Sequence, residues 1–70
     1  MDYKVKSAAE ATEIAESFIK KYRWYRRPLK AVREDNTWLV EIDVGPLFTV
    51  IAKIKIDAIS GDILEYTIPA

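Results

Sequence analysis

The sequence predicts an α+β fold, in which one N-terminal helix packs on a four-stranded antiparallel meander sheet. Three observations predict this architecture. Apolar residues recur at helical spacing over residues 7–25, and they alternate with polar residues after Pro28. Turn signals interrupt the alternating part at residues 35–36, 45–46 and 59–61. At 70 residues, the chain makes a single domain spanning residues 1–70.

The helix is expected to begin at a capping box. The Ser7 hydroxyl can accept a hydrogen bond from the Glu10 amide, and the Glu10 carboxylate can reach back to the Ser7 amide. Acidic residues come early in the segment and basic residues late, which is the order that the helix dipole favours. Pro28 forbids continuation, so we expect the helix over about residues 7–25. Its inward stripe would comprise Ala8, Ala11, Ile14, Ala15, Phe18, Ile19 and Tyr22.

Four strands are expected after the helix, at residues 29–34, 37–44, 47–57 and 63–68. The first has mixed patterning, because Leu29 and Ala31 compete with Val32 for the inward face. The other three alternate, which places one set of side chains toward the helix. The expected inward residues are Trp38, Val40, Ile42 and Val44, then Phe48, Val50, Ala52, Ile54 and Ile56, then Leu64, Tyr66 and Ile68.

The strand register follows from the requirement that paired residues share a face of the sheet. A three-residue loop at residues 45–47 meets this requirement for the middle hairpin, and a two-residue loop does not. Its pairs would be Val44 with Phe48, Ile42 with Val50, and Trp38 with Ile54. The last hairpin would pair Ala58 with Asp62, Ile56 with Leu64, Ile54 with Tyr66 and, on the outer face, Lys55 with Glu65.

Composition excludes several kinds of site and partner. The chain has no Cys and no His, which removes disulfides, thiolate chemistry and the commonest metal ligand. Its 11 basic and 11 acidic residues cancel, so no overall field draws it to nucleic acid or to an anionic membrane. No apolar stretch is long enough to span a bilayer, and no signal peptide is seen. We therefore expect a cytoplasmic protein with no membrane partner, with a mature exported form as the alternative.

Residue usage also points to a thermophilic source. The chain has no Gln and a single Asn, and 31% of its residues are charged. Thermophile proteins tend toward few thermolabile residues and many Lys and Glu.

A catalytic role is not expected, because no side chain titrates near neutral pH in its ordinary state. Glu41 and Asp43 share a strand face and could hold a metal or move a proton. A solvated strand face is the simpler interpretation, since a domain this small encloses little space. Asp57 and Asp62 flank the last turn, where Asp ordinarily hydrogen-bonds the backbone, with a weak cation site as the alternative. We expect no enzyme activity, no cofactor and no metal.

Residues 20–33 form the one asymmetric feature of the charge pattern. They hold seven of the 11 basic residues and no acidic residue, interleaved with aromatic residues. Such a segment can bind phosphates and stack bases, which makes nucleic-acid binding one hypothesis. The alternative is structural, because cations complement a helix C-terminus and lie along aromatic rings. The candidate interaction residues in this segment are Arg23, Trp24, Tyr25, Arg26, Arg27 and Lys30.

A second candidate surface is an apolar trio on the expected outer face of the sheet. Leu39, Ile51 and Ile63 lie there among charged residues. A domain with a thin core and no disulfide can gain stability by pairing with another chain, through a sheet face or an open edge strand. A protein partner or a homodimer is therefore the first hypothesis for function.

The segment from Ile54 to Leu64 resembles the signature of PepSY domains. The features that resemble the signature are a strand that ends in Asp-Ala, a turn made of a small residue, Gly and an acidic residue, and a strand that begins with an aliphatic pair. The upstream helix and the strand around Trp38 resemble the same layout, over about residues 7–68. The resemblance implies a small non-catalytic protein-interaction module, because PepSY modules occur in peptidase propeptides and exported proteins and are associated with binding or inhibiting peptidases. Asp57 and Gly61 match the family's turn, and we assign them structural roles.

Overall fold

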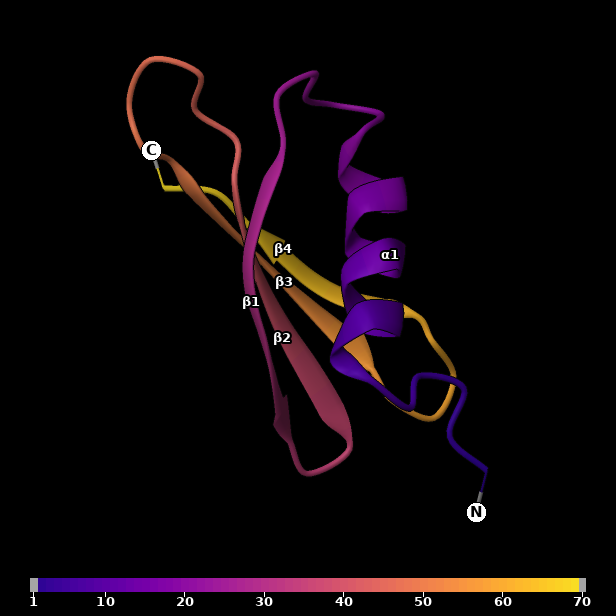
Figure 1. Ribbon diagram of the computed structural model, residues 1–70. Coiled ribbons are helices and arrows are strands. Elements are labelled where there is room, and N and C mark those ends of the chain that lie inside the picture. Colours follow the sequence, from indigo (N-terminus) through magenta and orange to yellow (C-terminus); the bar gives the residue numbers. More distant parts are fainter. Residues whose placement is uncertain (1, 70) are drawn as a thin grey trace.

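The structure has one helix lying on one face of a four-stranded sheet (Figure 1). It is a computed structural model that describes residues 2–69. The strands lie in the order β1-β2-β3-β4, and every neighbouring pair is antiparallel, so the predicted α+β meander is confirmed. The elements are α1 (Ala8–Ile19), β1 (Arg27–Glu34), β2 (Thr37–Asp43), β3 (Ile51–Asp57) and β4 (Ile63–Thr67). Within residues 2–69, no helix is long and apolar enough to cross a membrane.

The predicted cap begins α1, with one difference in detail. The Ser7 Oγ accepts from the Glu10 amide at 3.2 Å, in extended backbone geometry. The Glu10 carboxylate reaches back to the Lys6 amide at 3.0 Å and to the Ser7 hydroxyl at 3.4 Å, not to the Ser7 amide. Two donors at the start of the helix are therefore satisfied by side chains.

The helix ends at Ile19, so the expected extent to residue 25 is wrong. The Tyr22 and Arg23 amides both donate to the Ile19 carbonyl, which closes the last turn. The Arg26 guanidinium then donates to the carbonyls of Arg23 and Trp24. These contacts satisfy the backbone outside helical geometry, so the chain leaves the helix well before Pro28.

The core lies between α1 and the inner face of the sheet. Ala11, Ala15 and Ile19 are buried, and Ile14 and Phe18 pack against the core. The two ends of the expected stripe are wrong, because Ala8 and Tyr22 are exposed. From β2, β3 and the residue that follows β2, the buried apolar residues are Trp38, Val40, Ile42, Val44, Ala52, Ile54 and Ile56, as predicted.

The N-terminal segment adds a part of the core that the sequence pattern does not indicate. The Val5 and Lys4 amides donate to the carbonyls of Ala58 and Ile59, at 3.0 and 3.3 Å. The buried Trp38 indole donates to the Val5 carbonyl at 3.1 Å. Val5 is thereby fully buried and closes the end of the core beside the β3–β4 turn.

The predicted register of β2 with β3 is wrong by two residues. Ile42 pairs with Ala52 and Trp38 with Ile56, so the connecting loop is longer than expected. The faces stay correct because side chains repeat every two residues along a strand. The exception is Phe48, which leaves the strand and is 80% exposed instead of inward.

The last hairpin follows the prediction along most of its length. Lys55 pairs with Glu65 and Ile54 with Tyr66, as expected. A bulge then brings Ile63, not Leu64, opposite Ile56. Leu64 is therefore exposed, and the half-buried Ile63 packs against the core instead of lying on the outer face.

In the first strand, where the pattern left the inward residues open, Ala31 faces the core. It lies opposite Val40 and packs against the core, while Leu29 and Val32 are exposed. The register of β1 shifts between Pro28 and Lys30. A proline and a bulge on this edge strand hinder further strand pairing.

The tie between the N-terminal segment and the sheet can be tested with Trp38→Phe. The substitution leaves the buried Val5 carbonyl without its donor, so we expect the free energy of unfolding to fall by about 1–3 kcal/mol. We also expect the Val5 amide to exchange faster with solvent in NMR hydrogen exchange. An unchanged exchange rate at Val5 would contradict this account of the tie.

Candidate interaction surface

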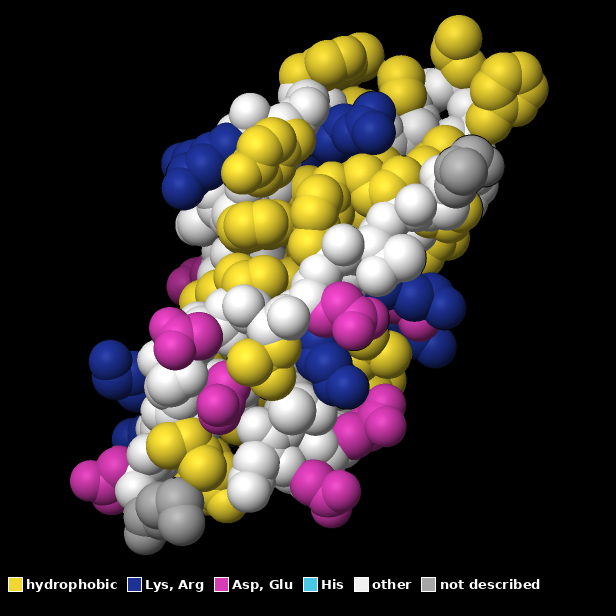
Figure 2. Space-filling model, turned by 180° about the vertical axis from the view of Figure 1, so that it is seen from behind, with side chains coloured by type: hydrophobic (Ala, Val, Ile, Leu, Met, Phe, Trp, Pro, Cys, Tyr) yellow, Lys and Arg dark blue, Asp and Glu magenta, His cyan; other side chains and the backbone are white. Residues whose placement is uncertain are grey.

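Two connections meet at one end of the sheet, and we call this region the loop end. They are residues 20–26, between α1 and β1, and residues 44–50, between β2 and β3 (Figure 1). Figure 2 shows hydrophobic side chains gathered at this end of the molecule, with Lys and Arg side chains between them. The loop end is therefore both apolar and basic.

Four large apolar or aromatic side chains of the loop end are open to solvent. Trp24 is 80% exposed, Tyr22 62%, Leu47 87% and Phe48 80%. Tyr22 still stacks on Tyr66, with ring centroids 6.2 Å apart, so it also closes the edge of the core. Exposed apolar side chains that form a contiguous patch are typical of interaction surfaces.

A cavity of about 260 Å³ lies within the loop end and joins the two connections. Arg23 lines it from the first connection. Among residues 2–69, the Arg23 side chain makes no ion pair and no hydrogen bond. The other lining residues are Val44, Gly45, Pro46, Leu47, Phe48 and Val50. The cavity is thus an apolar hollow beside one unpaired guanidinium.

The carboxylate of Asp43 holds the 44–50 loop in place. It is 3% exposed, and its Oδ1 accepts from the Gly45 and Val50 amides at 3.0 and 3.2 Å. Its Oδ2 lies 3.5 Å from an Arg27 nitrogen. The hydrogen bond from the Gly45 amide holds the pKa of Asp43 below its ordinary value. Burial acts in the opposite direction and raises the pKa, whereas the Val50 hydrogen bond and the Arg27 charge lower it further. Asp43 is therefore a structural anion, which argues against the acid–base role considered for it with Glu41.

Gly45 is required by the shape of this loop. A Cβ at this position would overlap the Phe48 carbonyl oxygen and lie 2.9 Å from the Val50 side chain. The close approach lets the chain turn back within the loop and carries Leu47 and Phe48 outward.

The basic segment at residues 20–33 does not form one continuous surface. Arg27 pairs with Asp43, and the Lys30 nitrogen lies 3.7 Å from Glu41. Arg33 stacks over the Tyr3 ring at the opposite end of β1. Arg26 binds backbone carbonyls, so four of the seven cations, including Arg26, have intramolecular partners. The three without an ion pair or side-chain hydrogen bond among the described residues are Lys20, Lys21 and Arg23.

The remaining aromatic candidate, Tyr25, is half-buried, and its ring packs edge-on to Trp24 at 5.9 Å between centroids. It supports the exposed indole more than it offers a surface of its own.

The predicted apolar trio on the outer face is not a single surface. Ile63 turns to the core at the β4 bulge, as described above. Leu39 is half-buried and lines a hollow with charged side chains of β3 and β4. Ile51 lies opposite Asp43 at the loop end. The trio is therefore dispersed, which argues against a contact surface at the middle of the sheet.

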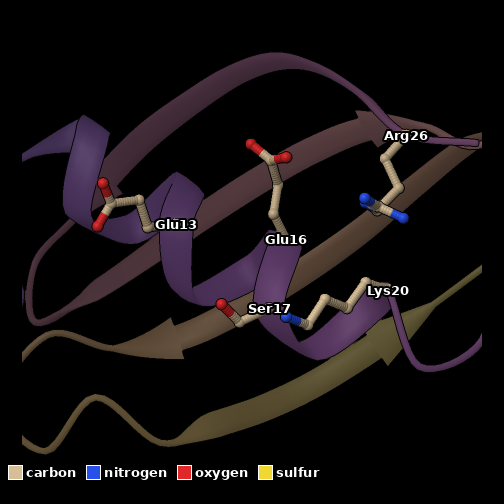
Figure 3. A pocket seen from close by; sticks show the side chains of 5 residues that line it. All are labelled: Glu13, Glu16, Ser17, Lys20 and Arg26. Carbon is tan, nitrogen blue, oxygen red and sulfur yellow. The ribbon is translucent and has the colours of Figure 1, made fainter.

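A separate cavity of about 340 Å³ lies along α1 (Figure 3). Glu13, Glu16, Ser17 and Lys20 project from the helix, and Arg26 reaches in from the following connection. The charges of the two acidic and the two basic side chains cancel there, and most of the side chains are exposed. Residues 2–69 contain no group of acidic side chains arranged to hold a metal ion.

The β3–β4 turn has the backbone chemistry expected of its residues. The Asp57 carboxylate accepts from the Ile59 amide at 2.8 Å and from the Ser60 amide at 3.4 Å. Gly61 has a φ of 82° and donates to the Asp57 carbonyl. Asp57 is thus occupied by its own turn, which argues against a cation site there.

Comparisons with known proteins add no assignment. No family model, no curated protein and no solved structure matches this chain. The resemblance to PepSY domains stays a prediction, and the geometry of the loop end carries the functional argument.

The role of Gly45 can be tested with Gly45→Ala. Because the added methyl group meets backbone atoms, we expect the free energy of unfolding to fall by about 1–3 kcal/mol and the amide resonances of residues 44–50 to shift. Gly61→Ala is the matched control. Its Cβ has space, so it should incur only the strain of a positive φ and leave the 44–50 loop unchanged. Equal effects of both substitutions on that loop would contradict the steric argument.

The anchoring role of Asp43 predicts a specific loss of stability in acid. A carboxyl whose pKa is lower in the folded than in the unfolded state binds fewer protons when folded. Its contribution is therefore complete above the ordinary value of 3.8 and is lost as the pH falls through the folded-state pKa. We expect thermal melts followed by circular dichroism to show Tm falling below about pH 4, with a shallower acid decline in Asp43→Asn. Parallel acid profiles for the two proteins would contradict this.

Proposed function

We propose that the chain is a non-catalytic protein-interaction module whose contact surface is the loop end. The observation that carries the proposal is the exposure of Trp24, Leu47 and Phe48 at one end of the molecule. Each would bury a large apolar area against a partner, and aromatic side chains dominate binding energy at interfaces. Asp43 and Gly45 hold the loop that presents two of them, which reduces the entropy lost on binding.

The contacts of the two acidic residues considered for acid–base chemistry support the non-catalytic part of the proposal. Asp43 is held as an anion, and Glu41 pairs with Lys30. The cavity at the loop end is lined by no nucleophilic side chain.

The partner that we propose is a different protein, not a second copy bound end to end. Two identical loop ends would bring their cations together, which disfavours a symmetric contact. An edge-to-edge dimer would use β4, because Pro28 and the bulge hinder pairing at β1. The resemblance to PepSY domains supports a peptidase as the class of partner.

Nucleic-acid binding is the second candidate. The exposed Trp24 and Tyr22 beside Lys20, Lys21 and Arg23 favour it. The intramolecular partners of the other four cations in residues 20–33 weigh against it, since phosphate binding depends on free cations.

The proposal is tested by affinity capture from the source cells with a matched pair of variants. Trp24→Ser combined with Phe48→Ser removes two anchors of the loop end. Leu64→Ser removes an exposed apolar side chain of β4 and serves as the control. We expect capture of specific proteins by the wild type and the control, and loss of at least about nine-tenths of it in the double variant. Equal capture by all three proteins, or capture that nuclease treatment abolishes, would refute the proposal.

A further inference from the structure

We infer that the loop end takes a short acidic peptide segment, with one apolar side chain in the cavity beside Arg23 and flanking carboxylates on the nearby cations. This inference rests on the proposed protein-binding function and specifies the partner's chemistry. The evidence comes from the size of the cavity, the charge around it and the dimensions of the end.

The cavity has the size for one side chain. Its volume of about 260 Å³ lies below the range of about 300–1,000 Å³ typical of small-molecule and cofactor sites. Its walls are the apolar side chains of the 44–50 loop, with no acidic residue. A Phe or Leu side chain could fill it without leaving a polar group unpaired.

The charge at the rim selects carboxylates. Arg23 lines the cavity, and Lys20 and Lys21 lie in the same connection. None of the three forms an ion pair within residues 2–69, although Lys20 also lines the cavity along α1 with Glu13 and Glu16. The only acidic residue of the two connections and the strand ends beside them is Asp43, which is buried and already bound. A carboxylate next to the anchor side chain would therefore meet an unpaired guanidinium.

The dimensions of the end favour a peptide over a folded surface. The molecule measures 42 by 19 by 17 Å, and both connections of the loop end lie at one end of the sheet (Figure 1). An end with extents of 19 and 17 Å is narrow for a standard interface, in which each partner buries about 800 Å² of accessible surface. An extended segment needs less area, because one anchored side chain and a few ionic contacts can hold it.

Other occupants fit these observations less well. A bilayer surface would contact the protruding Trp24 and Leu47 and leave the cavity without a ligand. A single-stranded nucleic acid would stack on the open rings and meet only three free cations. A second copy would place the same cations against one another.

The test is NMR titration of the full chain with three capped peptides. They are Glu-Asp-Phe-Glu-Asp, the same peptide with Ser for Phe, and Lys-Lys-Phe-Lys-Lys. We expect the first to shift the amides of Arg23, Val44, Leu47 and Phe48 and to leave Val5 unchanged. The Ser peptide should bind at least about tenfold more weakly, and the basic peptide should cause no shifts.

Two charge-reversal variants identify the cation. Arg23→Glu should weaken the acidic peptide at least about tenfold, whereas Lys4→Glu, at the opposite end, should change its affinity less than about twofold. Phe48→Ala should also weaken binding, and the amide spectrum of each variant shows whether it is folded. Equal binding of the Phe and Ser peptides, or insensitivity to Arg23→Glu in a folded variant, would overturn the inference.

The outcomes separate this inference from the proposed function. If no peptide shifts the loop end while protein capture still depends on Trp24 and Phe48, the acidic-peptide inference fails and the interaction module stands. If protein capture does not depend on Trp24 and Phe48, both the proposed function and the acidic-peptide inference fail. Titration with oligothymidine and with vesicles of phosphatidylserine completes the set. Shifts at the same amides from either one, in the absence of any from the acidic peptide, would also overturn the inference.

Discussion

The loop end depends on one buried carboxylate. Asp43 is the last residue of β2, and its two backbone hydrogen bonds and its ion pair join the 44–50 loop to β1. A buried anion is tolerated because each of these partners offsets its lost hydration. The same contacts extend the loop beyond the expected three residues and shift the register of β3. The exposure of Leu47 and Phe48 follows from that shift.

The sequence predicted the architecture because its periodicities are clear, but it could not fix the details set by tertiary contacts. Registers that differ by two residues satisfy the same-face rule equally well, so the pattern could not reveal the loop that Asp43 closes. Pro28 is the first hard stop after the helix, yet hydrogen bonds to Ile19 and from Arg26 end the helix earlier. Val5 lies outside any periodic segment, and only its tertiary contacts with Trp38 and Ala58 identify it as core.

Only part of the candidate site could be predicted from the sequence, for a related reason. Residues 20–33 form a basic cluster in the sequence, but a strand extends along half of that segment and carries Arg33 to the far end of the molecule. The structure brings Arg23 together with Leu47 and Phe48 around one cavity, although the pattern had assigned Phe48 to a strand. No local signal could join these two segments, because their proximity depends on the end of the helix and on the loop after β2. Gly45 followed by Pro46 was the one available sign of an unusual loop.

The antiparallel order of the strands also determines where the two described ends of the chain lie. The segment around Val5 is fixed beside the β3–β4 turn, while β4 runs back and finishes at the loop end (Figure 1). A label or surface tether placed ahead of Val5 would therefore stand at the opposite pole of a body 42 Å long. The same attachment after β4 would sit at millimolar effective concentration beside the cavity and compete with whatever enters it.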